Sequence, residues 1–205
     1  MNKSEFFSED GILVQSEKYI LKTLTEDDKD NYLKLYRENS IVAKTSSKMS
    51  DVDYDEFAEF VWQKLPEDDA IYVSIYYAAD NAYVGNITMQ HLTSDTPEVG
   101  IDVLKQYQRQ GIAQDTIPMF TRRILEFKKV EFFLVRIYSD NVASTKLFEK
   151  LGAERSGYEL SEFGAILVRM KENLKNEYDE LLTRNPDIED IANEKCILQY
   201  RYRPK

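Results

Sequence analysis

Residues 98–113 read Glu-Val-Gly-Ile-Asp-Val-Leu-Lys-Gln-Tyr-Gln-Arg-Gln-Gly-Ile-Ala, and they decide how the rest of the chain is interpreted. The alternation of polar and apolar residues over 98–104 predicts a strand with one buried face. Gly111 permits a tight turn, and the run from there to about Phe127 predicts a helix. The backbone amides of residues 109–113 then point out of the helix N-terminus, which favours phosphate binding. An ordinary strand-to-helix turn is the alternative for so short a pattern.

The segment around Gly111 differs from two common nucleotide-binding loops. It lacks the Gly-Lys-Ser/Thr of a Walker A loop, and it lacks the Gly-x-Gly-x-x-Gly of the dinucleotide-binding fold. A phosphate site here would therefore be of another kind.

Helices and strands are interleaved on both sides of this segment. Upstream we expect a strand over 18–24, helices over 25–37 and 53–64, and a hairpin of strands over 70–78 and 82–92. Downstream we expect strands over 130–138, 154–160, 164–171 and 195–202, with helices over 141–151 and 172–183. The pattern predicts an α/β fold with a mixed, mostly antiparallel sheet, helices on both faces and a C-terminal helix-strand extension.

Composition excludes several classes of protein. The 205 residues carry a formal net charge of −10, which argues against nucleic-acid and anionic-membrane partners. No apolar run approaches the roughly 20 residues of a spanning helix. The single cysteine, Cys196, and the single histidine, His91, leave little for a disulfide framework or a metal centre. We expect a cytoplasmic protein that needs no metal.

Charge is unevenly distributed along the chain. Residues 105–155 contain 10 Lys and Arg against 6 Asp and Glu, whereas residues 1–70 contain 9 against 17. This division suits an anionic cofactor beside the basic part and a cationic amine beside the acidic part. A merely solvated acidic surface is the alternative.

Two motifs in the same order resemble the GCN5-related N-acetyltransferases (GNAT). The acyl-CoA pyrophosphate loop of that family, Gln/Arg-x-x-Gly-x-Gly/Ala, is matched by Gln108, Gly111 and Ala113. The run from Asp140 to Ala153 is similar to the family's Asn-x-x-Ser helix, with Ala153 in place of the usual aromatic residue. Residues 18–28 resemble the start of the ribosomal-protein-alanine N-acetyltransferase branch, and ordered matches extend from about 18 to 170.

The resemblance implies a sheet that splays where acetyl-CoA binds, between the strands at 98–104 and 131–138. It implies an acetyltransferase domain over 1–171, with an extension over 172–205 that packs on the same domain or on a dimer partner. The cofactor-binding residues that it implies are Val103, Leu104, Gln108, Arg109, Gln110, Gly111, Ile112, Ala113, Asn141, Ser144 and Phe148.

Amine acetylation requires a neutral amine, a polarised carbonyl and a protonated leaving thiolate. Glu98 and Asp102 lie on the polar face of the predicted strand, and Glu98 stands near the base position of several family members. A strand-edge carboxylate is the alternative role for Glu98. A backbone amide near Val103 or Leu104 would polarise the carbonyl. Because Phe148 occupies the position where many relatives carry a tyrosine acid, Ser144 is the candidate near the thiolate.

The expected function is direct transfer of an acetyl group from acetyl-CoA to a primary amine, either a protein N-terminus or a small cationic amine. A polyamine- or aminoglycoside-type acetyltransferase is the alternative within the class. A catalytically silent acyl-CoA-binding regulatory module is the alternative outside it, and Phe148 favours that reading. A homodimer is left open.

Overall fold

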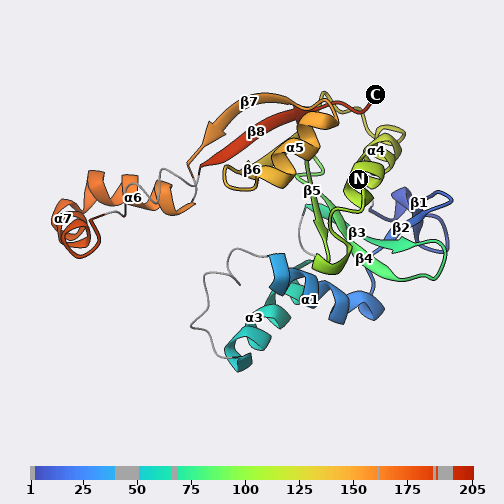
Figure 1. Cartoon of the computed structure of the whole chain (residues 1–205), viewed down its shortest axis with the longest axis horizontal. Helices are drawn as coiled ribbons and strands as arrows, with labels where there is room; N and C mark the ends of the chain where they lie inside the picture. The colour runs from blue at the N-terminus through green and yellow to red at the C-terminus, as the bar shows by residue number, and fades with distance from the viewer. Residues whose placement is uncertain (1–2, 40–50, 66–68, 161, 187, 189–195) are drawn as a thin grey trace. The chain divides into compact units, whose positions relative to one another are not determined.

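A computed structural model describes residues 3–39, 51–65, 69–160, 162–186, 188 and 196–205 (Figure 1). The described residues form an α/β fold with eight strands in one mostly antiparallel sheet, as the sequence predicts. The chain divides into two compact units, Met1–Phe133 with Pro204–Lys205 and Leu134–Arg203, and each is considered by itself.

The first unit holds five strands whose spatial order follows the sequence. Neighbouring strands are antiparallel throughout. They are β1 (Ile12–Gln15), β2 (Tyr19–Thr23), β3 (Ala70–Tyr77), β4 (Tyr83–Gln90) and β5 (Glu98–Val103). The predicted strands at 18–24, 70–78, 82–92 and 98–104 are confirmed within a few residues at their ends, whereas β1 was not predicted.

Helices lie on both faces of these strands (Figure 1). One face carries α1 (Lys29–Asn39) and α3 (Asp51–Lys64), and α4 (Ile112–Leu125) lies on the other. The short 3-10 helices of this unit are η1 (Lys3–Phe6), η2 (Glu26–Asp28) and η4 (Lys105–Tyr107). The three predicted helices are therefore present, the first of them as η2 followed by α1.

Strand register determines which side chains face which helices. Ile87 pairs with Val73 and Ile101, and buried residues of this face, such as Ile75 and Met89, belong to the core. Residues of the opposite face alternate with these residues along each strand. Many of them are polar. That face belongs to α1 and α3, and its members are Tyr72, Ser74, Asn86, Thr88, Gly100 and Asp102.

The second unit contains three strands in the order β6-β8-β7. Its elements are β6 (Phe133–Tyr138), α5 (Val142–Lys150), β7 (Glu154–Glu159), α6 (Glu162–Asn173), α7 (Lys175–Arg184) and β8 (Ile197–Tyr202). Gly152 has φ of 86° and follows α5, as expected for a residue that ends a helix. Since β8 pairs with β7, residues 197–202 of the predicted extension belong to the sheet itself.

The predicted strand over 164–171 is wrong, because these residues lie within α6. Leu167 is buried against Tyr178 of α7, and Met170 packs on the same cluster. Positions three residues apart share a helix face, so a paired helix can bury the apolar residues that suggested a strand. The predicted domain boundary after residue 171 falls inside the same helix.

Candidate active site

The loop between β5 and α4 is held by its own polar side chains. The Gln108 side-chain amide donates to the Val103 carbonyl oxygen at 2.9 Å. Gln110 donates to the Gln106 carbonyl oxygen at 3.1 Å and accepts a hydrogen bond from the Tyr77 hydroxyl at 3.1 Å. These bonds fix the loop to β5 and to β3, so the backbone that precedes α4 has a defined conformation.

Gly111 begins α4 in the left-handed conformation, with φ of 85°. A Cβ atom at this position would have no heavy atom within 4 Å, so the space beside the backbone is open. The first helical bond runs from the Asp115 amide to the Gly111 carbonyl oxygen at 3.0 Å. The amides of Ile112 and Ala113 precede that bond, and such amides bind anions at helix N-termini. The backbone present here therefore fits a pyrophosphate group.

Arg109 is also left-handed, with φ of 62°, although it is not a glycine. Strained backbone of this kind is concentrated at binding sites, where the surroundings hold it in place. The Arg109 side chain is exposed, so its charge is available to an anionic ligand. Ile112, by contrast, is 2% exposed, which leaves only its backbone at the surface of the loop.

At the C-terminal end of β5, the backbone amides of Val103 and Leu104, the two candidates for polarising the carbonyl, differ in their hydrogen bonding. The Leu104 amide donates to the Val84 carbonyl oxygen at 3.0 Å, so it is already engaged. Backbone groups of successive strand residues point to opposite edges, which directs those of Val103 away from β4. The Val103 carbonyl accordingly accepts from Gln108 and, at 3.4 Å, from the Asn39 side chain. Leu104 is corrected as an amide donor, and Val103 is retained.

A cavity of about 340 Å³ lies where α1 and α3 cover β3, β4 and β5. Its walls combine aromatic and aliphatic side chains, and its floor consists of strand residues. The helices contribute Tyr32, Leu35, Tyr36, Phe60, Val61 and Lys64, with Leu65 just beyond α3, and the strands contribute Tyr72, Asn86, Thr88, Gln90 and Asp102. Asp102 is exposed, whereas Asn86 is only 3% exposed. We call this space the strand-floor cavity.

Glu98 and Asp102 occupy the same face of β5, as predicted, but at opposite ends of the strand. Four residues of extended strand place them about 13 Å apart, so one amine cannot contact both. Asp102 is adjacent to Val103 and lines the strand-floor cavity. Glu98 is half-buried at the start of β5, opposite Gln90. Geometry therefore favours Asp102 over Glu98 as the carboxylate near the reacting amine.

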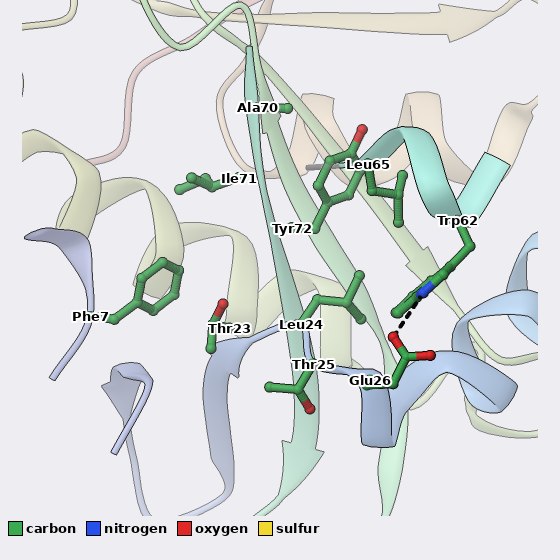
Figure 2. A pocket seen from close by; sticks show the side chains of 10 residues that line it. All are labelled: Phe7, Thr23, Leu24, Thr25, Glu26, Trp62, Leu65, Ala70, Ile71 and Tyr72. Carbon is green, nitrogen blue, oxygen red and sulfur yellow. Dashed lines mark hydrogen bonds between the residues drawn. The ribbon is translucent and has the colours of Figure 1, made fainter. Parts of the chain in front are cut away.

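A second cavity, of about 320 Å³, lies beside the start of β3. Figure 2 shows Trp62 and Leu65 on one side and Phe7 on the other. Its carboxylate, Glu26, accepts a hydrogen bond from the Trp62 indole at 3.0 Å and pairs with Lys29 at 3.5 Å. The carboxylate of this cavity is thus already engaged by Trp62 and Lys29.

The second unit carries the other predicted residues on α5. The Asn141 side-chain oxygen accepts from the Ser144 amide at 3.1 Å, so Asn141 caps the helix. Ser144 is half-buried in the first turn. Phe148 is 2% exposed and lies edge-on to Tyr202, with ring centroids 6.2 Å apart. The aromatic position is thus part of the core of this unit.

Comparison with known proteins gives the family of the chain. A family model described as "Acetyltransferase (GNAT) domain" matches residues 18–154. The chain belongs to the GNAT acetyltransferase family. No curated protein matches it in sequence.

Solved GNAT structures share the fold of the chain at low sequence identity. A chimera of the Vibrio cholerae spermidine N-acetyltransferase and hSSAT has a TM-score of 0.61 at 13% identity, covering 90% of this chain and 94% of that one. A proposed ribosomal-protein-serine acetyltransferase from Vibrio cholerae has a TM-score of 0.60 at 14% identity, covering 93% and 97%. The protein is therefore an acyltransferase of the GNAT family.

Sequence reasoning missed the residues of the strand-floor cavity other than Asp102. Asn86 had a detectable signal, because it is an amide within the otherwise mostly apolar run Tyr83-Val-Gly-Asn-Ile. Tyr32, Tyr36 and Phe60 had none, since aromatic residues at helical spacing are usual in any core. Among the described residues, no group of three or more His, Cys, Asp or Glu could hold a metal ion, and no helix is long and apolar enough to cross a membrane.

Proposed function

We propose that this GNAT protein transfers the acetyl group of acetyl-CoA directly to a primary amine. The observation that carries the proposal is the backbone at Gly111, which is left-handed, open on its Cβ side and placed at the start of α4. A cytoplasmic location is part of the proposal, in keeping with the free thiol of Cys196.

The loop residues would hold acetyl-CoA through its phosphates. The amides of Gly111, Ile112 and Ala113 would donate to the pyrophosphate, and Arg109 would add positive charge. Gln108 would act indirectly, since its bond to the Val103 carbonyl oxygen fixes the end of β5. When bound, acetyl-CoA supplies an acetyl group activated as a thioester.

The acceptor amine would occupy the strand-floor cavity. Asp102 would hold the ammonium form and assist its deprotonation, directly or through water. The Val103 amide would donate to the carbonyl oxygen on which negative charge develops. Glu98 is the alternative base, acting over a longer water-mediated path.

The thiolate would be protonated with the help of α5. Ser144 lies one turn before Phe148 on that helix, so its hydroxyl is the candidate donor where the family tyrosine is missing. A serine hydroxyl has no suitable pKa of its own, so its role would be one link in a water relay. Asn141 would orient this first turn through its cap.

A silent acyl-CoA-binding regulatory module is the second candidate function, and buried Phe148 is the observation that favours it. Such a module would bind CoA and release no thiol with any amine. A polyamine- or aminoglycoside-type enzyme would instead show turnover with those acceptors.

Thermal unfolding with and without CoA tests the cofactor site. A ligand that binds only the folded state raises its melting temperature, so CoA should stabilise the wild type. Gly111→Asp would place a carboxylate in the phosphate site and should abolish the shift. Gly11→Asp is the matched control, because Gly11 is also left-handed, with φ of 72°, but lies in the turn before β1. Equal CoA stabilisation of both variants would remove the loop from the proposal.

A further inference from the structure

Asn86 is a buried side chain whose amide nitrogen has no hydrogen-bond partner among the described residues. It is 3% exposed, stands on β4 and lines the strand-floor cavity. Buried amide donors are nearly always hydrogen-bonded, because burial removes their hydrogen bonds to water and another acceptor must replace them. A donor that lines a cavity without a partner is suited to an acceptor oxygen brought by a ligand.

Asn86 is directly opposite Asp102 in the antiparallel pair of β4 and β5. The Leu104 amide bonds the Val84 carbonyl oxygen, and pairs alternate along the ladder, so Asn86 and Asp102 form a hydrogen-bonded pair. The Cα atoms of such a pair are about 5.5 Å apart, and both side chains leave the same face. A neutral donor and a carboxylate are therefore neighbours on the cavity floor.

Gly100 lies on the same face of β5 as Asp102. It pairs with Thr88, and a Cβ atom at Gly100 would lie 2.9 Å from the Thr88 hydroxyl. The Thr88 hydroxyl thus occupies the space that a Gly100 side chain would need, and Thr88 lines the cavity on the same face as Asn86.

We propose that Asn86 selects acceptors in which the amine lies next to a hydrogen-bond-accepting oxygen, as in an amino-acid amide or a peptide N-terminus. The Asn86 amide would donate to the carbonyl oxygen of the acceptor, while Asp102 would accept from its α-ammonium group. The nitrogen and oxygen of an α-amino amide are three bonds apart, within about 3.5 Å, so neighbouring side chains can bind both. This assignment deepens the proposed function and rests on it.

A polyamine fits the same floor less well. Its protonated nitrogens are donors only, so they would leave the Asn86 amide facing another donor. The aromatic walls formed by Tyr32, Tyr36 and Phe60 suit an apolar side chain next to the amine. The cavity thus discriminates by chemistry between the two acceptor classes.

The test compares alaninamide with sec-butylamine, which has a similar shape but lacks the carbonyl oxygen, and with spermidine. Thiol release from acetyl-CoA gives kcat/KM for each amine. The wild type should prefer alaninamide to sec-butylamine by about tenfold or more. Asn86→Leu should lower kcat/KM for alaninamide by a similar factor and change that for sec-butylamine by less than about twofold. Asn86→Asp should also lower it for alaninamide, because a donor becomes an acceptor.

Binding without acetyl-CoA provides a second readout. Alaninamide should raise the melting temperature of the wild type, and Asn86→Leu should lose that shift while its own melting temperature does not fall. Asn31→Leu, at an exposed position of α1, is the matched control and should behave as the wild type. An α-amino group is less basic than an alkylamine, so part of the preference for alaninamide is independent of Asn86. Equal kcat/KM for the three amines in the wild type, or a preference that is undiminished in Asn86→Leu, would overturn the role of Asn86 alone. Absence of thiol release with every amine would overturn the proposed function as well.

Discussion

Asp28 and Tyr83 show how single buried polar residues shape the surroundings of the site. Asp28 is 2% exposed and accepts hydrogen bonds from the Thr25 amide at 3.0 Å, the Ser74 hydroxyl at 2.9 Å and the Tyr76 hydroxyl. These bonds join the start of α1 to β3. Tyr83 is also buried, but its hydroxyl has no hydrogen-bond partner among the described residues. Burial, and then the charge of Asp28, raises the pKa of Tyr83 well above its usual value of 10.0.

The raised pKa of Tyr83 predicts a loss of stability in alkali. Below pH about 10 the phenol is neutral in both states and contributes no pH dependence. Above that pH the unfolded chain loses this proton while the folded chain keeps it, so the free energy of unfolding falls as pH rises. Tyr83→Phe should therefore lose less stability than the wild type between about pH 8 and about pH 11. Urea unfolding at the two pH values measures the loss of unfolding free energy. Identical losses in the two proteins would contradict the raised pKa of Tyr83.

At the scale of elements, the close approach of β4 to β5 fixes the position of the C-terminal end of β5, where Asp102 and Val103 lie. A Cβ atom at Gly85 would lie 2.3 Å from the Asp102 carbonyl oxygen and 3.0 Å from the Val103 Cα atom. Only glycine fits here without a shift of backbone, so Gly85 sets the position of Asp102 and Val103 in the sheet.

Gly85→Ala should displace the end of β5 and impair catalysis more than cofactor binding. We expect a destabilisation of about 1–3 kcal/mol from overpacking, with a fall in kcat for thiol release. The thermal shift caused by CoA should persist, because the Gly111 loop is unchanged. Gly157→Ala in β7 is the control, since its added Cβ would meet only the Gln199 side chain, at 3.4 Å. Similar kcat values for the two variants would count against this role of Gly85.

The elements also show how far sequence reasoning extends. Strands and helices with a clear period were predicted, and so were the tight turn at Gly111 and the end of α5 near residue 151. Residues 164–171 were misassigned because a short apolar run fits a strand or a buried helix equally well, and only the contact of Leu167 with Tyr178 decides. Asp102 was predicted as a candidate base. The preference for Asp102 over Glu98 depends on the distance between them along β5, which the rise per strand residue sets. The unpartnered donor of Asn86 is a three-dimensional property that no local pattern contains.

At the scale of the whole molecule, the family match gives the reaction class, and the fold agrees with it. The uneven charge along the chain suits the two oppositely charged substrates of that reaction. Residues 105–155, which include the Gly111 loop and all of α5, are the basic part of an acidic chain. The acidic part includes α3, which carries five Asp and Glu against one Lys and lines the proposed acceptor cavity. An anionic cosubstrate and a cationic acceptor would be attracted to different parts of one protein.

The most direct test of amine acetylation is thiol release from acetyl-CoA, measured with and without alaninamide for the wild type and Asp102→Asn. We predict saturable, amine-dependent release by the wild type. In Asp102→Asn, kcat/KM should fall by about 10²–10⁴-fold, the usual contribution of a proton-transfer partner, while the CoA thermal shift is retained. CoA binding without amine-dependent thiol release by the wild type would contradict the account and identify a silent acyl-CoA-binding module instead.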